Sequence, residues 1–126
     1  TDRLQAQGND YEAIMLKMLA DRLVEALSEK LHYEVRTRIW GYAPDEVCNP
    51  ADMIRGNYVG IRPAIGYPAD PVPLHKQTVF SILDATNHTG VQLTETLGMS
   101  PAASVCGYYF ANDAARYIVV GETDGQ

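Results

Sequence analysis

Apolar residues in the first third of the chain recur every three or four positions. This spacing places them on one face of an amphipathic helix. Asn9 stands where a helix cap is expected, and Glu12, three residues later, completes a capping box. Gly41 follows Trp40 and marks the expected end of the helix. The pattern therefore predicts one long helix over residues 9–40, with a stripe of Leu16, Leu19, Leu23, Leu27 and Leu31 widened by Met15 and Val24.

Between residues 42 and 90 the pattern predicts two further helices separated by a short strand and a stiff loop. Asn49 before Pro50 is a favourable helix start. Residues 58–61 have the composition of a short strand, and four prolines follow within the eleven residues 63–73. Such a segment is incompatible with regular structure throughout, so we expect a shaped loop there. A second amphipathic helix then carries Val79, Phe80, Ile82 and Leu83 and ends within residues 87–90.

The last third of the chain has the alternation and composition of β-strands. Apolar and polar residues alternate over residues 91–97, as in a half-buried strand. Residues 105–111 are apolar or aromatic on both faces, as in a central strand. A turn at residues 112–115 leads into a third predicted strand over residues 117–121. The connections between these segments are short, which favours antiparallel pairing.

Composition and charge narrow the functional classes. The 126 residues suit one ordinary domain, and the formal net charge is −6. The ten basic residues are scattered and outnumbered, which disfavours binding to nucleic acid or to a membrane surface. No apolar stretch approaches the ~20 residues of a membrane span, and the N-terminus lacks a signal-peptide pattern. We therefore expect a cytoplasmic protein. Cys48 and Cys106 are expected to be unpaired thiols, with a single long-range disulfide between them as the less common alternative.

Several kinds of chemical site have no sequence support. The chain has neither a phosphate-binding loop nor a glycine fingerprint after a strand, so a doubly wound nucleotide site is not expected. His32, His75 and His88 are far from one another and from both cysteines at metal-ligand spacing, which argues against a metal site. Each histidine is expected to be a surface residue or a capping residue. Ser100 and Ser104 lack the sequence context of a nucleophile elbow, so a conventional hydrolase is not indicated.

Residues 62–68, RPAIGYP, form the segment best suited to chemistry. The Arg62 guanidinium is a rigid fork of donors that fits a carboxylate. Pro63 stiffens the chain, and Gly66 permits a positive φ or a close backbone approach. A stiff loop that presents Arg62 and Tyr67 is suited to a small zwitterion. The alternative is that Arg62 makes a surface ion pair and Tyr67 packs on the prolines.

The same segment carries a family resemblance. The motif RxxxGY within RPAxGYP resembles the activation domain of cobalamin-dependent methionine synthase. Further segments resemble that family in the same order, and the likeness extends over residues 10–121. They are DYEAIM at residues 10–15, ADRL at 20–23, WGYAP at 40–44, LTE at 93–95 and PAASV at 101–105.

The resemblance implies a fold and a function. It implies an α+β fold, an antiparallel twisted sheet with flanking helices, that binds S-adenosylmethionine on an exposed inner face. The larger enzyme moves methyl groups from methyltetrahydrofolate to homocysteine through cobalamin. When the cobalamin is oxidised, an electron from flavodoxin or an equivalent reductase and a methyl group from S-adenosylmethionine reactivate it. The implied partners are the enzyme's own cobalamin-binding domain and that reductase.

The resemblance also assigns roles to residues. Arg62 matches the arginine that suits the ligand's carboxylate, and Tyr67 matches the tyrosine that faces the ligand and the incoming cobalamin. Glu25 matches an acidic position suited to the ligand's positive charge, with a solvated helix carboxylate as the alternative. Tyr117 matches a further contact, with cross-strand packing as the alternative. The S-adenosylmethionine-binding residues implied are Arg62, Pro63, Ala64, Gly66, Tyr67, Tyr117 and Glu25, with no catalytic residue and no metal ligand among them.

The chain departs from the family pattern at several points. Gly56 stands where some members have a glutamate, and Ile65 replaces a common proline. The family domain extends upstream, where it contributes a ligand-binding aspartate, and downstream in a helical segment, and neither has a match here. We therefore expect residues 1–126 to be the central part of one activation domain and a fragment of a longer enzyme. The isolated fragment is not expected to be catalytic.

Two other functions remain open at the level of sequence. One is an interaction module without a ligand, which docks on a cobalamin domain or on flavodoxin through its acidic face. The other is a stand-alone activator of another corrinoid protein. Binding of S-adenosylmethionine distinguishes the leading hypothesis from the interaction module. Homocysteine, folate and cobalamin modules in the upstream sequence would exclude the stand-alone activator.

Overall fold

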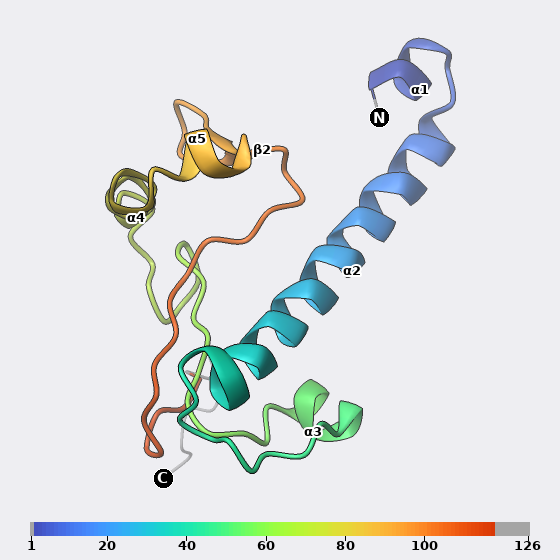
Figure 1. Ribbon diagram of the computed structural model, residues 1–126. Coiled ribbons are helices and arrows are strands. Elements are labelled where there is room, and N and C mark those ends of the chain that lie inside the picture. The colour runs from blue at the N-terminus through green and yellow to red at the C-terminus, as the bar shows by residue number, and fades with distance from the viewer. Residues whose placement is uncertain (1, 118–126) are drawn as a thin grey trace, which may run out of the picture.

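The structure of the chain, a computed structural model, describes residues 2–117. Its dominant element is the long helix α2 (Asp10–Glu34), preceded by the short helix α1 (Asp2–Ala6). Figure 1 shows α2 as a diagonal arm whose C-terminal end meets the rest of the chain, while its N-terminal end and α1 project away. The helix predicted from the leucine spacing is therefore confirmed, and it is packed at one end.

The start of α2 differs from the prediction. The Asn9 side chain makes no capping hydrogen bond, so the expected capping box is wrong. The backbone carbonyl of Asn9 instead accepts the first helical bond from the N–H of Ala13, at 3.0 Å. Because the backbone of Asn9 has φ −95° and ψ 58°, the residue lies outside the extended conformation that a side-chain cap requires.

The end of the helical segment agrees with the prediction. α2 continues into a π-helical segment, η1 (Val35–Ile39), in which the N–H of Trp40 reaches back five residues to the carbonyl of Val35. The N–H of Gly41 bonds to the same carbonyl, and its φ of +73° turns the chain out of the helix. A left-handed residue of this kind favours glycine and ends the helix.

Helix α3 (Pro50–Arg55) begins as the sequence predicts. The Asn49 side chain accepts from the N–H of Ala51 at 3.0 Å, with Pro50 at the first helical position. Gly56 ends the helix in the left-handed conformation. The prediction of a short helix after residue 49 is thus confirmed.

The second predicted helix is divided into two. α4 (His75–Leu83) ends at Asp84, whose φ of +46° breaks the helical path, and α5 (Ala85–Thr89) follows at once. Aspartate tolerates the left-handed region because its short side chain bonds locally. Here the Asp84 carboxylate accepts from the Asn87 amide at 2.9 Å. The expected end near residues 87–90 is confirmed.

The regular sheet is smaller than predicted. β1 (Gln92–Leu93) pairs antiparallel with β2 (Met99–Ser100), with Gln92 opposite Ser100. The predicted strand over 91–97 is wrong beyond Leu93, because the N–H of Leu97 bonds to the carbonyl of Thr94 and closes a turn. The alternating residues 94–97 therefore reverse the chain instead of extending it.

Residues 105–111, predicted as a central strand, form an interrupted ladder with residues 61–65. Isolated antiparallel bridges join Ile61 to Phe110 and Ala64 to Gly107. Between the bridges Pro63 accepts a bond from the N–H of Tyr108 but has no N–H to return one. The loss of this bond explains why neither segment is a continuous strand. The short strand predicted over 58–61 is likewise reduced to the bridge at Ile61, and the predicted strand beyond Tyr117 lies outside the described residues.

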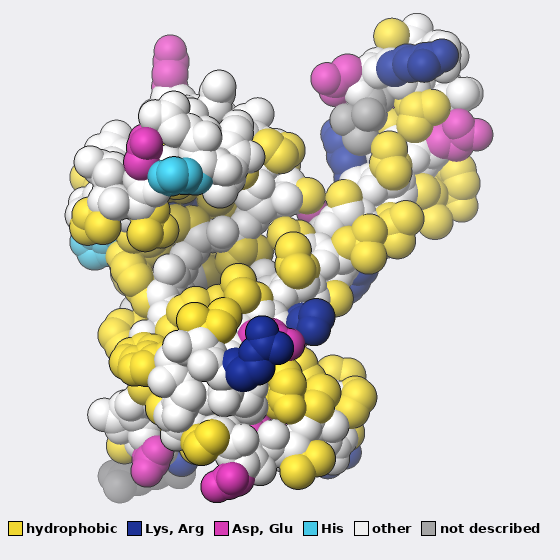
Figure 2. Space-filling view, in the orientation of Figure 1, with side chains coloured by type: hydrophobic (Ala, Val, Ile, Leu, Met, Phe, Trp, Pro, Cys, Tyr) yellow, Lys and Arg dark blue, Asp and Glu magenta, His cyan; other side chains and the backbone are white. Residues whose placement is uncertain are grey.

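The α+β fold class is confirmed, and most of the core lies where the C-terminal end of α2 meets the rest of the chain. Val35 in η1, Ile65 and Cys106 are its buried apolar residues, whereas Ala13 is buried separately near the N-terminal end of α2. The leucine stripe of α2 is exposed, and yellow side chains run along that arm in Figure 2. Both cysteines are unpaired thiols, as expected. Among the described residues no helix is long and apolar enough to cross a membrane.

Candidate functional site

Arg62 is fixed to the rest of the molecule through both its backbone and its side chain. Its neighbour Ile61 exchanges two backbone hydrogen bonds with Phe110, at 3.0 and 3.1 Å. The Arg62 N–H donates to the Tyr117 hydroxyl at 2.8 Å. The guanidinium Nη2 lies 2.5 Å from Oε1 of Glu29 in α2, and the side chain is only 19% exposed. The ion pair foreseen as an alternative thus exists, but it is part-buried.

The acidic residue that pairs with Arg62 is Glu29, whereas the family resemblance assigned Glu25 to the positive charge of the ligand. Glu25 lies one helical turn before Glu29, where it pairs with Arg22 at 2.9 Å and is largely exposed. The structure therefore brings Arg62 to Glu29 and leaves Glu25 on the surface of α2. Sequence reasoning missed Glu29, although its four-residue spacing from Glu25 places both on one helix face.

Pro63 and Ala64 are held against the facing segment at close range. The N–H of Tyr108 donates to the carbonyl of Pro63 at 3.0 Å, and Ala64 bridges to Gly107. A side chain at Gly107 has no room, since a Cβ atom there lies 2.3 Å from the Pro63 carbonyl oxygen. Glycine at this position allows the two segments to approach.

The backbone of Ala64 forms an open edge. In the ladder the bonds to residues 106–110 come from Ile61, Pro63 and Ile65, so the intervening residues point their backbone groups to the other side. Arg62 gives its N–H to Tyr117, and the backbone of Ala64 makes no hydrogen bond within residues 2–117. The N–H and carbonyl of Ala64 can therefore bind a small polar ligand.

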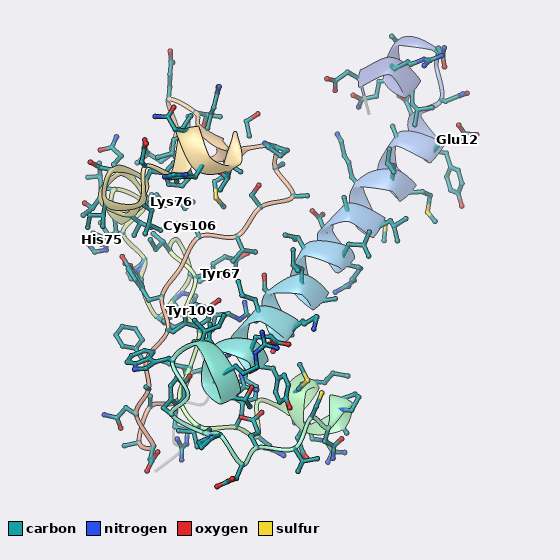
Figure 3. The ribbon with its side chains drawn as sticks, in the orientation of Figure 1. Glu12, Tyr67, His75, Lys76, Cys106 and Tyr109 are labelled. Carbon is teal, nitrogen blue, oxygen red and sulfur yellow. The ribbon has the colours of Figure 1, made fainter. Side chains whose placement is uncertain are left out.

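Gly66 and Tyr67 begin a tight turn. Gly66 has a φ of +97°, and its N–H donates to the carbonyl of Asp70 at 2.7 Å. The N–H of Asp70 donates back to Tyr67 at 2.9 Å. The Tyr67 side chain is 67% exposed, and Figure 3 shows it between the α4–α5 region and the C-terminal end of α2. The turn presents the Tyr67 ring to solvent.

Polar contacts of Asp70 join this turn to α4. Oδ1 of Asp70 lies 2.8 Å from Nδ1 of His75, the first residue of α4. Desolvation works against the charged form of Asp70, yet the bonds from His75 and from the N–H of Val72 outweigh it and lower its pKa. Burial raises the pKa of the nearby Cys106 thiol. These contacts fix the turn to α4.

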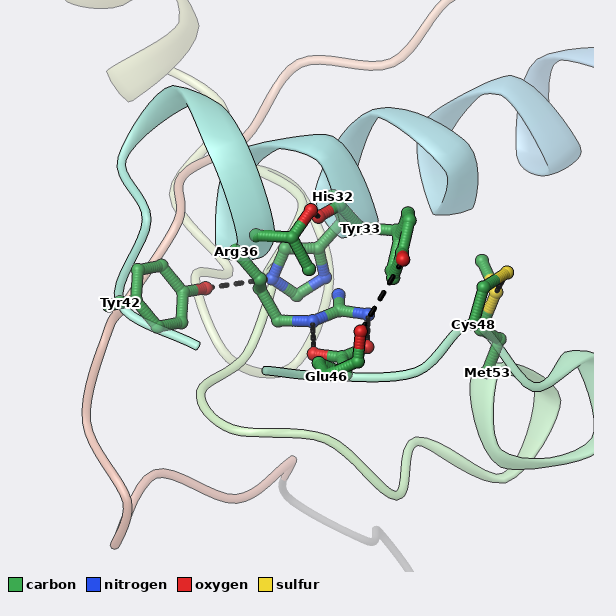
Figure 4. A network of polar contacts seen from close by, with 8 residues as sticks. His32, Tyr33, Arg36, Tyr42, Glu46, Cys48 and Met53 are labelled. Atoms are coloured by element: carbon green, nitrogen blue, oxygen red, sulfur yellow. Dashed lines mark hydrogen bonds and ion pairs between the residues drawn. The ribbon is translucent and has the colours of Figure 1, made fainter. Parts of the chain in front are cut away.

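Figure 4 shows a buried polar cluster around Arg36 that the sequence did not predict. Arg36 is fully buried and makes two bonds of 2.6 Å to the Glu46 carboxylate. Its guanidinium carbon also lies 4.0 Å from the centre of the Tyr58 ring. His32 is fully buried, so its expected surface position is wrong. The cause is the aromatic enclosure by Tyr58 and Tyr109, whose ring centres lie 5.0 and 5.2 Å away.

Burial and charge keep this cluster in one protonation state. Desolvation, reinforced by the positive charges of Arg36 and Arg62, lowers the pKa of His32 to about 3. Its Nε2 lies 3.3 Å from the Tyr42 hydroxyl. Desolvation and a hydrogen bond with Tyr117 raise the pKa of Tyr58 well above its usual range. At neutral pH both His32 and Tyr58 are therefore uncharged.

Tyr117 connects the buried cluster with the loop. Its hydroxyl accepts from the N–H of Arg62 and is hydrogen-bonded with Tyr58. Tyr117 therefore does more than pack across strands, the alternative considered from the sequence. It fixes the backbone of Arg62 relative to the cluster.

A cavity of about 270 Å³ lies beside the loop, close to the lower end of the ~300–1,000 Å³ typical of small-molecule sites. Its walls come from α2, α4, the Arg62 loop and residues 104–109, and they are mostly apolar. They include Leu31, Arg62, Ala64, Phe80 and Tyr109. Among the described residues no group of three His, Cys, Asp or Glu side chains is arranged to hold a metal ion.

The arrangement offers a guanidinium, an open backbone edge and an exposed tyrosine beside an apolar hollow. The structure brings together Arg62, Pro63, Ala64, Gly66 and Tyr67 as one loop, with Tyr117 bonded to it, and leaves Glu25 apart. These groups can bind a small ligand with a carboxylate and an apolar part. They contain no nucleophile activated by a neighbouring base.

A family model and a solved structure both match this chain, and they point to the same family. Residues 1–126 match the family model for the activation domain of vitamin B12-dependent methionine synthase. A crystal structure of the MetH reactivation domain bound to AdoHcy is similar, with 50% sequence identity and a TM-score of 0.89. The match covers 93% of this chain and 36% of that chain, so this chain spans about a third of its neighbour's length.

Proposed function

This chain belongs to the family of vitamin B12-dependent methionine synthase activation domains, and we propose that it binds S-adenosylmethionine through the Arg62 loop. One observation carries the proposal. The structural neighbour, half identical in sequence, is bound to AdoHcy, the compound that remains when S-adenosylmethionine has given up its methyl group. The two share the adenosine, the sulfur and the amino-acid end, so a site for one suits the other.

The proposed contacts follow from the geometry of the loop. Arg62 pairs with the ligand's carboxylate, because a guanidinium binds carboxylates through directed, charge-assisted hydrogen bonds. The open backbone edge at Ala64, shaped by Pro63 and Gly66, hydrogen-bonds the ligand's polar groups. Tyr67 faces the ligand, and Tyr117 fixes the Arg62 backbone. Glu25, exposed on α2, supplies negative charge toward the sulfonium or ammonium group.

We further propose that the bound ligand serves reactivation of cobalamin in a methyltransferase. S-adenosylmethionine supplies an electrophilic methyl group, while the cobalamin is held by another domain of the enzyme. The residues of this chain orient the methyl donor and leave one side open to the cobalamin domain, which agrees with the exposure of Tyr67. Flavodoxin or an equivalent reductase is the proposed electron donor, and the proposed location is the cytoplasm.

Calorimetric titration of S-adenosylmethionine into the full-length protein tests the proposal. We expect saturable binding by the wild type and its loss in Arg62→Ala, because the ligand's carboxylate then has no guanidinium partner. Arg55→Ala is the matched control, since Arg55 is an exposed arginine of α3 away from the loop. Equal binding by Arg62→Ala and wild type would contradict the role of Arg62. Absence of binding to the wild type would contradict the function itself.

A further inference from the structure

Glu29 is the acidic group that the fold brings to Arg62. The two residues are 33 positions apart in sequence, and their ion pair joins α2 to the loop. The Glu29 side chain is 31% exposed and that of Arg62 is 19% exposed, so both lie partly out of water. An ion pair is stronger in such surroundings than on an open surface, because water screens it less.

The contact restrains the guanidinium and leaves some of its donors available. One oxygen of Glu29 meets one nitrogen, Nη2, whereas Arg36 uses two nitrogens on Glu46. A guanidinium has five N–H donors, so a single contact leaves the others for a second carboxylate. Within residues 2–117 the buried Nε of Arg62 has no hydrogen-bond partner. Arg62 is thus oriented by Glu29 without being saturated by it.

The neighbouring charges do not replace Glu29. Glu46 is engaged by Arg36, and Glu25 is engaged by Arg22 at the surface. His32, one turn beyond Glu29 on α2, is neutral at physiological pH and lies near enough to sense the charge of Arg62. Without the Glu29 carboxylate, the long Arg62 side chain gains freedom to turn toward solvent.

We propose that Glu29 is a positioning residue that holds the Arg62 guanidinium in the orientation needed to receive the ligand's carboxylate. The inference rests on the proposed function, and it adds a residue outside the loop to the site. Glu29 acts through Arg62 and makes no contact with the ligand. Its contribution is therefore tied to one chemical group of the ligand, the carboxylate.

The test compares two ligands that differ by that group. S-adenosylmethionine and decarboxylated S-adenosylmethionine share the adenosine, the sulfonium and the ammonium group, and only the first has a carboxylate. Calorimetry on the full-length protein is expected to show that Glu29→Gln weakens binding of S-adenosylmethionine about tenfold, the scale expected from a misplaced binding group. Binding of the decarboxylated ligand is expected to change less than about twofold. Glu29→Asp, which keeps the charge, is expected to recover part of the loss.

Glu34→Gln is the matched control, because Glu34 also lies on α2 in ion pairs, with Lys30 and Arg38, but away from Arg62. It is expected to bind both ligands as the wild type does. Equal weakening of both ligands by Glu29→Gln would overturn the proposal, since it indicates a structural role or a contact with the ammonium group. Unchanged binding of both would also overturn it. If the wild type binds neither ligand, the proposed function itself is contradicted. The measurement on the wild type alone shows this outcome, so it is distinct from a failure of the role proposed for Glu29.

Discussion

The two ends of helix α2 have opposite relations to their surroundings. Over most of its length, from Leu16 to Leu31, the helix carries an apolar stripe that is exposed, with Leu19 56% and Leu23 62% accessible. At its C-terminal end and in η1, the fully buried side chains are a histidine and an arginine, His32 and Arg36. Both regions belong to one continuous helical segment.

The difference shows that burial follows the available partners more closely than hydrophobicity. His32 and Arg36 are enclosed because Tyr58, Tyr109 and Glu46 arrive from segments distant in sequence. The leucines remain accessible because the described residues place no segment over them. An exposed apolar face of this extent is characteristic of an interaction surface.

The largest effect is expected from breaking the buried ion pair between Arg36 and Glu46. Arg36→Met removes the guanidinium and leaves the Glu46 carboxylate without its partner. We expect a loss of about 3–5 kcal/mol in the free energy of unfolding, measured by urea denaturation. The matched control is Arg38→Met, which removes an exposed pair with Glu34 and is expected to cost less than about 1 kcal/mol. Similar losses in both variants would show that the buried ion pair contributes no more to the free energy of unfolding than the exposed one.

The close approach of residues 61–65 to residues 106–110 is tested by Gly107→Ala. The added methyl group meets the Pro63 carbonyl oxygen, so the two segments must separate. We expect a loss of about 1–3 kcal/mol in stability, measured by thermal or urea unfolding. Gly98→Ala, where the nearest atom is the movable Thr94 hydroxyl at 3.2 Å, is expected to cost less. A tolerated alanine at Gly107 would contradict the close packing of the ladder.

The neutral state of His32 is tested by the pH dependence of stability. The native chain keeps His32 unprotonated down to a pKa of about 3, whereas the unfolded chain takes up a proton at its ordinary pKa of 6.5. Below pH 6.5 the unfolded state therefore binds more protons, and acidification favours unfolding. This stability is fully present above pH 6.5 and is lost as the pH falls toward 3, by up to ~1.4 kcal/mol per pH unit.

His32→Gln is expected to remove this component of the pH dependence between pH 6.5 and 4. The matched control is His88→Gln, at an exposed position of α5, which is expected to retain it. Urea denaturation at several pH values provides the measurement. A His32→Gln chain with the wild-type pH dependence would show that His32 accepts a proton in the folded state.

The smallest effect is expected on the exposed stripe. Leu23→Gln changes an accessible leucine, so the free energy of unfolding of this chain is expected to change by less than about 0.5 kcal/mol. Val35→Ala, at a buried position of η1, is expected to cost about 1–3 kcal/mol. Urea denaturation of both variants compares the two ends of the helical segment directly. A larger loss for Leu23→Gln would show that the stripe is covered in solution.

Local patterns in the sequence determined most of the helices and the loop that carries the candidate site, although they missed the short helix α1 and the break at Asp84. The leucine spacing, Gly41 and the Asn49–Pro50 start act within a few residues, so the position of α2 and the start of α3 follow from them. The RPAIGYP motif likewise located the loop and led to the family that the whole chain matches. The strands were less predictable, because a strand forms only where a second segment pairs with it. In the pairing of residues 61–65 with residues 106–110, Pro63 has no N–H to donate, so one hydrogen bond of the ladder is missing.

Only the tertiary structure decided which charges meet. No local signal distinguishes Glu29 from Glu25, since both lie on one face of the same helix, and only the approach of the loop selects Glu29 for Arg62. The same holds for His32, which the sequence predicts as a surface or capping residue and which the aromatic rings of distant segments enclose. Ion pairs and buried polar groups depend on distances of a few ångströms in space, and the sequence encodes these distances only through the whole fold.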